Sequence, residues 1–348
     1  MDEFNFNRPR PRFSFRLPSI RLSIRKVALS IAVIATVVGL VLALKSNQTP
    51  PKEVYVNPYE TLVGVTLSPK SFEGEDYTNF FVKVKEIGNT VSWAGPWQDF
   101  TKADGAPANI ATLAKQKDFM PVYITGPTLD EVKKGGYSAA MTEAIGKFAA
   151  TEQPKYIGIG NEIDQFYLSS PELLTNYLKS VEPVVARLRS TSASVKIFAT
   201  IQYERGQGLQ GGLFGGKNDE ADSVLKVILP QLEMFDFIAL TTYPGLIYKT
   251  PSELPDDYYT KIKSLTTKPI IFTEVGWSRT SPADGYDGSE SAQAEFIKKF
   301  RNQMKELSPK LQLWSFLYPP TAKAPFNTMN LLAADQETSP GFEAWKAK

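Results

Sequence analysis

The segment Tyr156-Ile-Gly-Ile-Gly-Asn161-Glu162 is a short apolar run that ends in an amide and a carboxyl side chain. Such a run is consistent with a strand buried on both faces, as in a parallel sheet. A second segment, Pro269-Ile-Ile-Phe-Thr-Glu274-Val-Gly-Trp277, has a similar pattern and carries Glu274 where its apolar run ends. Because functional groups in parallel α/β folds lie at the carboxyl ends of strands, Glu162 and Glu274 are the first candidate site residues.

Eight short runs rich in β-branched and apolar residues follow one another from residue 61 onward. They are residues 62–66, 90–93, 120–124, 156–159, 196–200, 237–241, 269–272 and 311–316. Between them lie longer segments with apolar residues three and four positions apart, as in residues 171–189 and 291–307, which predict helices. Eight strand–helix units predict an α/β fold, a (β/α)8 TIM barrel over residues 59–348, rather than an open doubly wound sheet.

The N-terminal part of the chain predicts a membrane tether. Residues 1–26 hold seven Lys or Arg against two acidic residues, a net charge of +5, and residues 27–44 form an 18-residue run without a charged side chain. At about 1.5 Å per residue this run spans roughly 27 Å, enough to cross a bilayer once. The positive-inside rule makes residues 1–26 a cytoplasmic leader and residues 27–44 a signal-anchor helix.

The tether prediction places the barrel outside the cell membrane. Residues 45–58 are polar and Pro-rich, and are interpreted as a linker between a single-pass transmembrane helix and an external domain. The alternative is a secretory signal peptide that is cleaved near Ala43. The basic leader is long and the apolar run exceeds the usual signal-peptide core of about 7–15 residues, which favours the uncleaved anchor.

Two missing residue types restrict the chemistry. The sequence has no Cys and no His, which excludes a disulfide framework, a thiol nucleophile, a Ser-His-Asp triad and the common His- or Cys-based metal sites. Acid–base work therefore falls to carboxyl groups, Lys and Tyr, and we expect neither a metal nor a cofactor. The whole chain has a net charge of +2, so residues 27–348 together carry −3 and give no electrostatic reason to expect nucleic acid as a partner.

Two Glu at the ends of the fourth and seventh predicted strands resemble the catalytic pair of clan A of the glycoside hydrolases. The resemblance covers the chain from about Thr61 to the C-terminus, and the Thr-Glu-Val-Gly-Trp stretch around Glu274 is similar to the endo-β-1,4-galactanase and β-1,3-glucanase families. Within this resemblance, Tyr243 matches the tyrosine that hydrogen-bonds the nucleophile, and Trp314 the aromatic floor under the sugar. Many families of the clan carry His near the site, and this chain has none.

The resemblance implies a retaining, double-displacement mechanism. Such enzymes need two carboxyl groups about 5–5.5 Å apart, one to protonate the leaving oxygen and one to attack the anomeric carbon. Glu162 would be the acid/base and Glu274 the nucleophile, with Asn161 binding the sugar 2-hydroxyl. An ionised Glu274 would disfavour ionisation of Glu162 and so keep it protonated for its first role. Structural ion pairing is the competing role for both Glu.

Further candidates for glycan contact are Trp93 and Trp277, with core packing as the competing role. Glu204 follows the fifth predicted strand and is interpreted as a solvated loop residue, and Asp164 as a helix-start residue. The sequence thus predicts a glycosidase acting on extracellular or cell-surface β-linked polysaccharide or oligosaccharide. The alternatives are a catalytically inactive glycan-binding barrel and a transglycosylase that remodels cell-wall glycan.

Overall fold

The computed structural model describes residues 61–346 of the chain. The predicted leader, transmembrane helix and linker, residues 1–58, lie outside the described residues and stay predictions. Within residues 61–346, none of the helices combines the length and the apolar character that crossing a bilayer requires.

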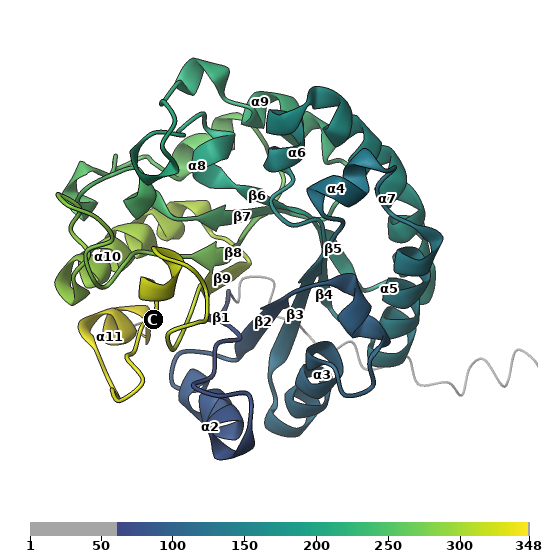
Figure 1. Cartoon of the computed structure of the whole chain (residues 1–348), viewed down its shortest axis with the longest axis horizontal. Helices are drawn as coiled ribbons and strands as arrows, with labels where there is room; N and C mark the ends of the chain where they lie inside the picture. The colour runs from purple at the N-terminus through teal and green to yellow at the C-terminus, as the bar shows by residue number, and fades with distance from the viewer. Residues whose placement is uncertain (1–60, 347–348) are drawn as a thin grey trace, which may run out of the picture. The chain divides into compact units, whose positions relative to one another are not determined.

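Parallel strands surrounded by helices form a barrel, which confirms the predicted α/β TIM-barrel architecture (Figure 1). The strands adjoin in the order β5-β4-β3-β2-β1-β9-β8-β7-β6, and all neighbours pair in parallel. Their bounds are β1 Leu62–Thr66, β2 Thr90–Ala94, β3 Met120–Thr125, β4 Tyr156–Ile159, β5 Lys196–Phe198, β6 Thr200–Gln202, β7 Ile238–Thr242, β8 Ile270–Val275 and β9 Leu311–Trp314.

The fifth predicted strand is divided in two, and the barrel closes at this division. The single run expected over residues 196–200 consists of β5, which pairs with β4, and β6, which pairs with β7. Backbone hydrogen bonds from Thr200 N to Gly160 O (2.9 Å) and from Ile163 N to Thr200 O (2.9 Å) join β6 to the chain that leaves β4. The residues that close the barrel therefore adjoin Asn161 and Glu162.

The helices lie outside the barrel and over its carboxyl end (Figure 1). The α-helices are α2 Gly74–Val84, α3 Ala106–Lys117, α4 Leu129–Lys133, α5 Ala139–Glu152, α6 Asp164–Ser169, α7 Pro171–Thr191, α8 Tyr203–Gly206, α9 Leu225–Ile228, α10 Glu290–Leu307 and α11 Pro340–Lys346. Short 3-10 helices cover Trp97–Thr101, Gly212–Phe214, Glu220–Asp222, Leu229–Gln231, Pro244–Leu246, Pro251–Glu253, Thr260–Ser264 and Phe326–Thr328. The two helices predicted at residues 171–189 and 291–307 are thus α7 and α10.

The core has two layers that follow the alternation of side chains along each strand. One cluster contains only residues in or next to strands and fills the barrel interior; its members are Val122, Ile124, Phe198, Phe237, Ala239, Ile271, Leu311 and Leu313. A larger cluster packs the outer face of the strands against the helices, and includes Trp314 of β9 and Phe296 of α10. Neighbouring residues of one strand, such as Leu313 and Trp314, therefore belong to different layers.

Trp345 of α11 ties the last helix to the first strand. Its side chain is fully buried, and its Nε1 donates a hydrogen bond to Gly64 O of β1 (3.1 Å). The indole lies 5.3 Å from the ring of Trp314 and 5.9 Å from that of Phe300, measured between ring centroids. This contact covers the junction of β1 and β9, where the chain's first and last strands pair.

We expect Trp345→Ala to lower the free energy of unfolding by about 3–5 kcal/mol, because it removes a buried indole and leaves a cavity beside Trp314. Denaturant unfolding followed by tryptophan fluorescence or circular dichroism measures this. Phe72→Ala is the matched control, since the Phe72 side chain is 65% exposed and its loss should change stability by less than about 0.5 kcal/mol. Equal effects of the two substitutions would contradict this account of closure.

Candidate active site

Glu162 stands in a strained turn just after β4. Its φ is 49°, a left-handed conformation that is uncommon for residues other than Gly, Asn and Asp. The backbone is held there because Glu162 N donates to Thr200 Oγ1 (2.7 Å) while the backbone of Thr200 closes the barrel. Strain of this kind costs on the order of 1–3 kcal/mol and is concentrated at functional sites.

Glu274 faces the site because of a bulge in β8. Consecutive residues Leu240 and Thr241 of β7 pair with Phe272 and Glu274, so Thr273 is an extra residue in β8. Phe272 and Val275 both pack in the outer layer although they are three positions apart, which regular alternation does not allow. The bulge therefore reverses the alternation and turns Glu274 to the inner side, as bulges next to active sites commonly do.

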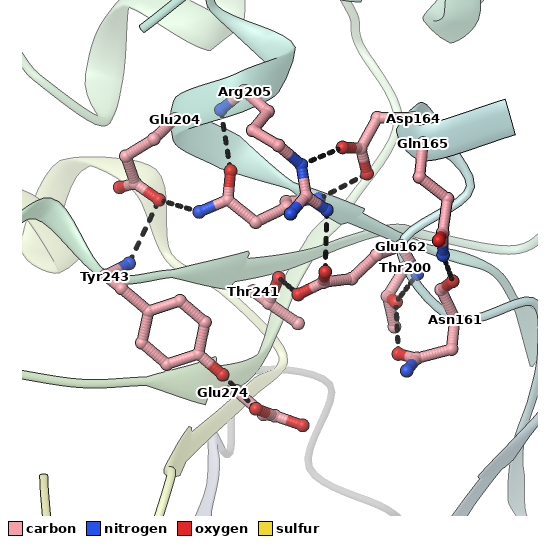
Figure 2. Close-up of polar contacts among 11 residues, drawn as sticks. Asn161, Glu162, Asp164, Gln165, Thr200, Glu204, Arg205, Thr241, Tyr243 and Glu274 are labelled. Atoms are coloured by element: carbon pink, nitrogen blue, oxygen red, sulfur yellow. Dashed lines mark hydrogen bonds and ion pairs between the residues drawn. The ribbon is translucent and has the colours of Figure 1, made fainter. Parts of the chain in front are cut away.

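Glu162 and Glu274 border the same space beside Thr241 and Tyr243 (Figure 2). Thr241 Oγ1 donates to Glu162 Oε1 (2.8 Å), and Tyr243 OH donates to Glu274 Oε2. Burial raises the pKa of Glu274 to about 7, opposed by the Tyr243 hydrogen bond and assisted by the nearby charge of Glu162. The two carboxyl groups thus interact electrostatically.

Asn161 is exposed next to Glu162. Its Oδ1 accepts a hydrogen bond from Thr200 Oγ1 (3.1 Å), which fixes the orientation of the amide. Within residues 61–346, Nδ2 of Asn161 has no hydrogen-bond partner. The amide group is therefore available as a donor beside Glu162, where the sequence predicts a contact to a sugar hydroxyl.

The three predicted tryptophans are buried, and their expected sugar contacts stay predictions. Trp314 is fully buried in the outer layer, because Leu311 and Leu313 take the interior positions of β9. Trp277 is 1% exposed and stacks on Phe296, and Trp93 packs on Phe100. Each of these tryptophans packs in the outer layer between the strands and the helices, which is the alternative role considered for them.

Other aromatic rings adjoin Tyr243 instead. Phe214, Phe316 and Phe326 are partly exposed and pack in one small cluster with Tyr243 and Leu246. The ring of Phe326 meets that of Tyr243 edge to face, at 5.1 Å between centroids. No sequence motif marks these three Phe residues. Their proximity to Tyr243 depends on how the chain segments after β6, β7 and β9 pack against one another.

Arg205, which the sequence analysis did not identify, binds Glu162. Its Nη2 contacts Glu162 Oε2 (2.6 Å) and its Nε contacts Asp164 Oδ2 (2.8 Å). Asp164 begins α6, as expected, but is fully buried, and its other oxygen accepts from Gln202 N (2.8 Å). Burial raises the pKa of Asp164 to about 6, and the Arg205 guanidinium opposes this rise.

Glu204 is buried rather than solvated. Its carboxylate accepts hydrogen bonds from Thr242 Oγ1 (2.6 Å), Tyr258 OH (2.9 Å) and Tyr243 N (3.0 Å). Burial raises its pKa, and these hydrogen bonds oppose the rise. Because Glu204 holds the backbone of Tyr243, it supports the hydroxyl that contacts Glu274, a role that only the folded arrangement reveals.

Solved structures of glycosidases share this architecture. They include the exo-β-1,4-mannosidase Op5Man5 from Opitutaceae bacterium strain TAV5 (13% identity, TM-score 0.57), covering 82% of this chain and 58% of that one. Xylanase 10B from Thermotoga maritima (12%, 0.57) covers 82% and 94%, and the GH53 catalytic domain of Ignisphaera aggregans (15%, 0.54) covers 84% and 97%. The similar structures are clan A glycoside hydrolases. The chain shares with them the fold of a parallel α/β barrel.

At 12–15% sequence identity, these similar structures show the fold of the chain alone. No family model matches the chain, and no curated protein matches it. The chain spans less than two thirds of the mannosidase but nearly all of the xylanase and of the GH53 domain. The particular families expected from the sequence therefore stay predictions.

The described residues also include a cavity outside the candidate site. A cavity of about 1180 Å³ opens beside residues Thr61 and Asn89, which precede β1 and β2, so it lies at the opposite end of the barrel from Glu162. Among the described residues no group of three or more Asp or Glu side chains is arranged to hold a metal ion.

We expect Tyr243→Phe to raise the pKa of Glu274 above its present value of about 7. The Tyr243 hydroxyl stabilises the charged carboxylate, so its loss favours the protonated form. Carboxyl ¹³C NMR titration of Glu-labelled protein measures the shift. Tyr248→Phe is the control, because Tyr248 is partly buried elsewhere and makes no hydrogen bond to Glu274; an unchanged titration in Tyr243→Phe would refute the assigned contact.

Proposed function

We propose that the chain is a retaining glycoside hydrolase that acts on β-linked polysaccharide or oligosaccharide. The observation that carries the proposal is the pair Glu162 and Glu274, which lie just after β4 and in the last part of β8 and border one space. Their electrostatic interaction and the Tyr243 hydroxyl on Glu274 support the assignment of a catalytic pair.

In this mechanism Glu274 attacks the anomeric carbon while Glu162 gives its proton to the leaving oxygen. The carbon–oxygen bond to the leaving group breaks, and an ester forms between the sugar and Glu274. Water then attacks the same carbon as Glu162 takes up its proton, so that Glu274 is released ionised and Glu162 is protonated again. Nδ2 of Asn161 would donate to the 2-hydroxyl during both steps.

The substrate class is proposed from the names of similar structures and from the site. A mannosidase, xylanases and a β-glucosidase share the fold, which supports a β-linked glycan without selecting the sugar. The likeness of the Glu274 segment to β-1,4-galactanases and β-1,3-glucanases makes those glycans the first to test. Phe316 and Phe326 are the proposed aromatic platforms in place of the buried tryptophans.

We also propose that residues 27–44 anchor the enzyme in the cell membrane with the barrel outside. The charge asymmetry of residues 1–26 and the length of the apolar run support this. Sequencing the N-terminus of mature protein tests it: recovery of the chain from its start supports the anchor, whereas a start near residue 45 indicates a cleaved signal peptide.

A catalytically inactive glycan-binding barrel is the second candidate. The ion pair between Arg205 and Glu162 favours it, because the guanidinium occupies the carboxyl group that would have to give a proton to the leaving oxygen. Binding to β-glycans without product formation would support this candidate. Transglycosylation uses the same residues, and products longer than the supplied oligosaccharide would reveal it.

We expect Glu162→Gln to reduce hydrolysis by about 10²–10⁴-fold, since it removes the general acid, and Glu274→Gln to abolish it. Activity is measured on a panel of β-glycans, with the anomer of the first product followed by NMR. Glu172→Gln, on the exposed start of α7, is the control and should leave turnover unchanged. Full activity of either site variant, or an inverted product, would contradict the retaining mechanism.

A further inference from the structure

The cavity at the amino end of the barrel is lined mainly by positive charges. It lies between α10, α11 and the chain that joins α2 to β2, and its volume of about 1180 Å³ has room for an organic ligand. Helices α10 and α11 pack side by side outside the strands (Figure 1). Among the lining residues one, Glu86, is acidic and five are basic, a net charge of +4; the basic residues are Lys85, Lys298, Arg301, Lys305 and Lys346. The cavity therefore favours an anion.

Three of these cations share one face of α10. Lys298, Arg301 and Lys305 follow one another at intervals of three and four residues, so their side chains leave the helix on the same side. Arg301 Nη2 donates to Trp345 O, and Lys305 Nζ donates to Asn302 Oδ1 (3.4 Å). Within residues 61–346 none of the three cations pairs with a carboxylate. Their charge is thus left without a counterion in the part of the chain that the structure describes.

Two polar atoms at this cavity are buried without a hydrogen-bond partner. They are Arg301 Nε and Gln312 Oε1, and both residues line the cavity. Gln312 is 5% exposed and lies between Leu311 and Leu313, which point into the barrel, so its side chain is on the outer face of β9. Buried polar atoms in folded proteins are nearly always hydrogen-bonded. A ligand that satisfies both atoms must offer an acceptor to Arg301 and a donor to Gln312.

We propose that this cavity binds an organic phosphate that carries a free hydroxyl group. The phosphate oxygens accept hydrogen bonds from Arg301, Lys298 and Lys305, and the hydroxyl donates to Gln312 Oε1. The cations reach the cavity from α10, α11 and the chain after α2. The tetrahedral oxygens of a phosphate meet donors from several directions, whereas a carboxylate presents two oxygens in one plane.

Two sources share this chemistry, a soluble glycerol phosphate and the headgroup of an anionic glycerophospholipid. Thr61, the first described residue, lines the cavity, so the chain that follows the proposed anchor of residues 27–44 enters the barrel beside it. A lipid headgroup is therefore one of the two sources to test. Binding here does not depend on the proposed hydrolysis, because Glu162 and Glu274 lie at the other end of the barrel.

The experiment is isothermal titration calorimetry of the full chain in detergent, with glycerol phosphate, inorganic phosphate and glycerate as ligands. We expect glycerol phosphate to bind with a dissociation constant of about 1 mM or lower, and inorganic phosphate to bind more weakly because it lacks the glycerol hydroxyls. Gln312→Leu should remove this difference. Added salt should weaken the binding of both phosphates, since it screens the lining charges.

Short-chain lipids distinguish the two sources. Dihexanoyl phosphatidylglycerol carries the phosphate and free hydroxyls, whereas dihexanoyl phosphatidylcholine carries a compensating positive charge. Tighter binding of the phosphatidylglycerol than of glycerol phosphate, with none of the phosphatidylcholine, supports the site as one for an anionic lipid. Binding of glycerol phosphate that the acyl chains do not improve supports it as one for a soluble phosphate.

The variants test the cations of α10. Lys298 and Lys305 are exposed, so replacing both by Gln should leave the fold intact and weaken phosphate binding by about tenfold. Arg301→Lys keeps the charge but removes Nε, and we expect a similar loss. Lys179→Gln is the matched control, because Lys179 is exposed on α7 and does not line the cavity. Thermal unfolding checks that each variant folds.

Three results would overturn the proposal. One is the absence of phosphate binding by the wild-type protein, which needs no variant. Another is unchanged affinity in the Lys298→Gln, Lys305→Gln double variant. The last is binding of glycerate as tight as that of glycerol phosphate, since glycerate carries the same kind of hydroxyl beside a carboxylate.

Discussion

Thr200 makes the hydrogen bonds on which both the barrel and the site depend. Its backbone N and O join β6 to the chain leaving β4, at Gly160 and Ile163, and its hydroxyl binds Glu162 N and Asn161 Oδ1. Closure of the sheet and the strained conformation of Glu162 are therefore parts of one structure. The strain is tolerated because the closing hydrogen bonds leave the turn after β4 no relaxed alternative.

On the other side of the barrel a single extra residue has a comparable effect. Side chains of a regular strand alternate between its two faces. Without the bulge, Glu274 would therefore point outward toward the helices together with Phe272, and Val275 would point to the barrel interior. The bulge at Thr273 changes this, and Glu274 reaches the inner side beside Tyr243. The position of the second carboxyl group is thus a property of strand pairing between β7 and β8.

Buried charges connect these two regions. Asp164 and Arg205 lie behind Glu162, and Glu204 lies behind Tyr243, with Gln202 in contact with both Arg205 and Glu204. Each buried carboxylate has several donors, which offsets the cost of removing it from water. Polar contacts therefore connect the residues that hold Glu162 with those that hold Glu274, through Gln202.

The sequence by itself determined the eight strand-forming runs, the barrel, and the location of Glu162 and Glu274 at the carboxyl ends of strands, because apolar runs and their polar termini are local patterns. It also narrowed the chemistry through the absence of Cys and His. Only the tertiary structure decided that Trp93, Trp277 and Trp314 are buried, that Glu204 is not solvated, and that Arg205 binds Glu162. Those positions depend on the bulge in β8, on the division of the fifth predicted strand and on loops that meet from distant parts of the chain. Such features are not local sequence patterns, and a one-residue change in strand register is enough to reverse the face on which a side chain lies.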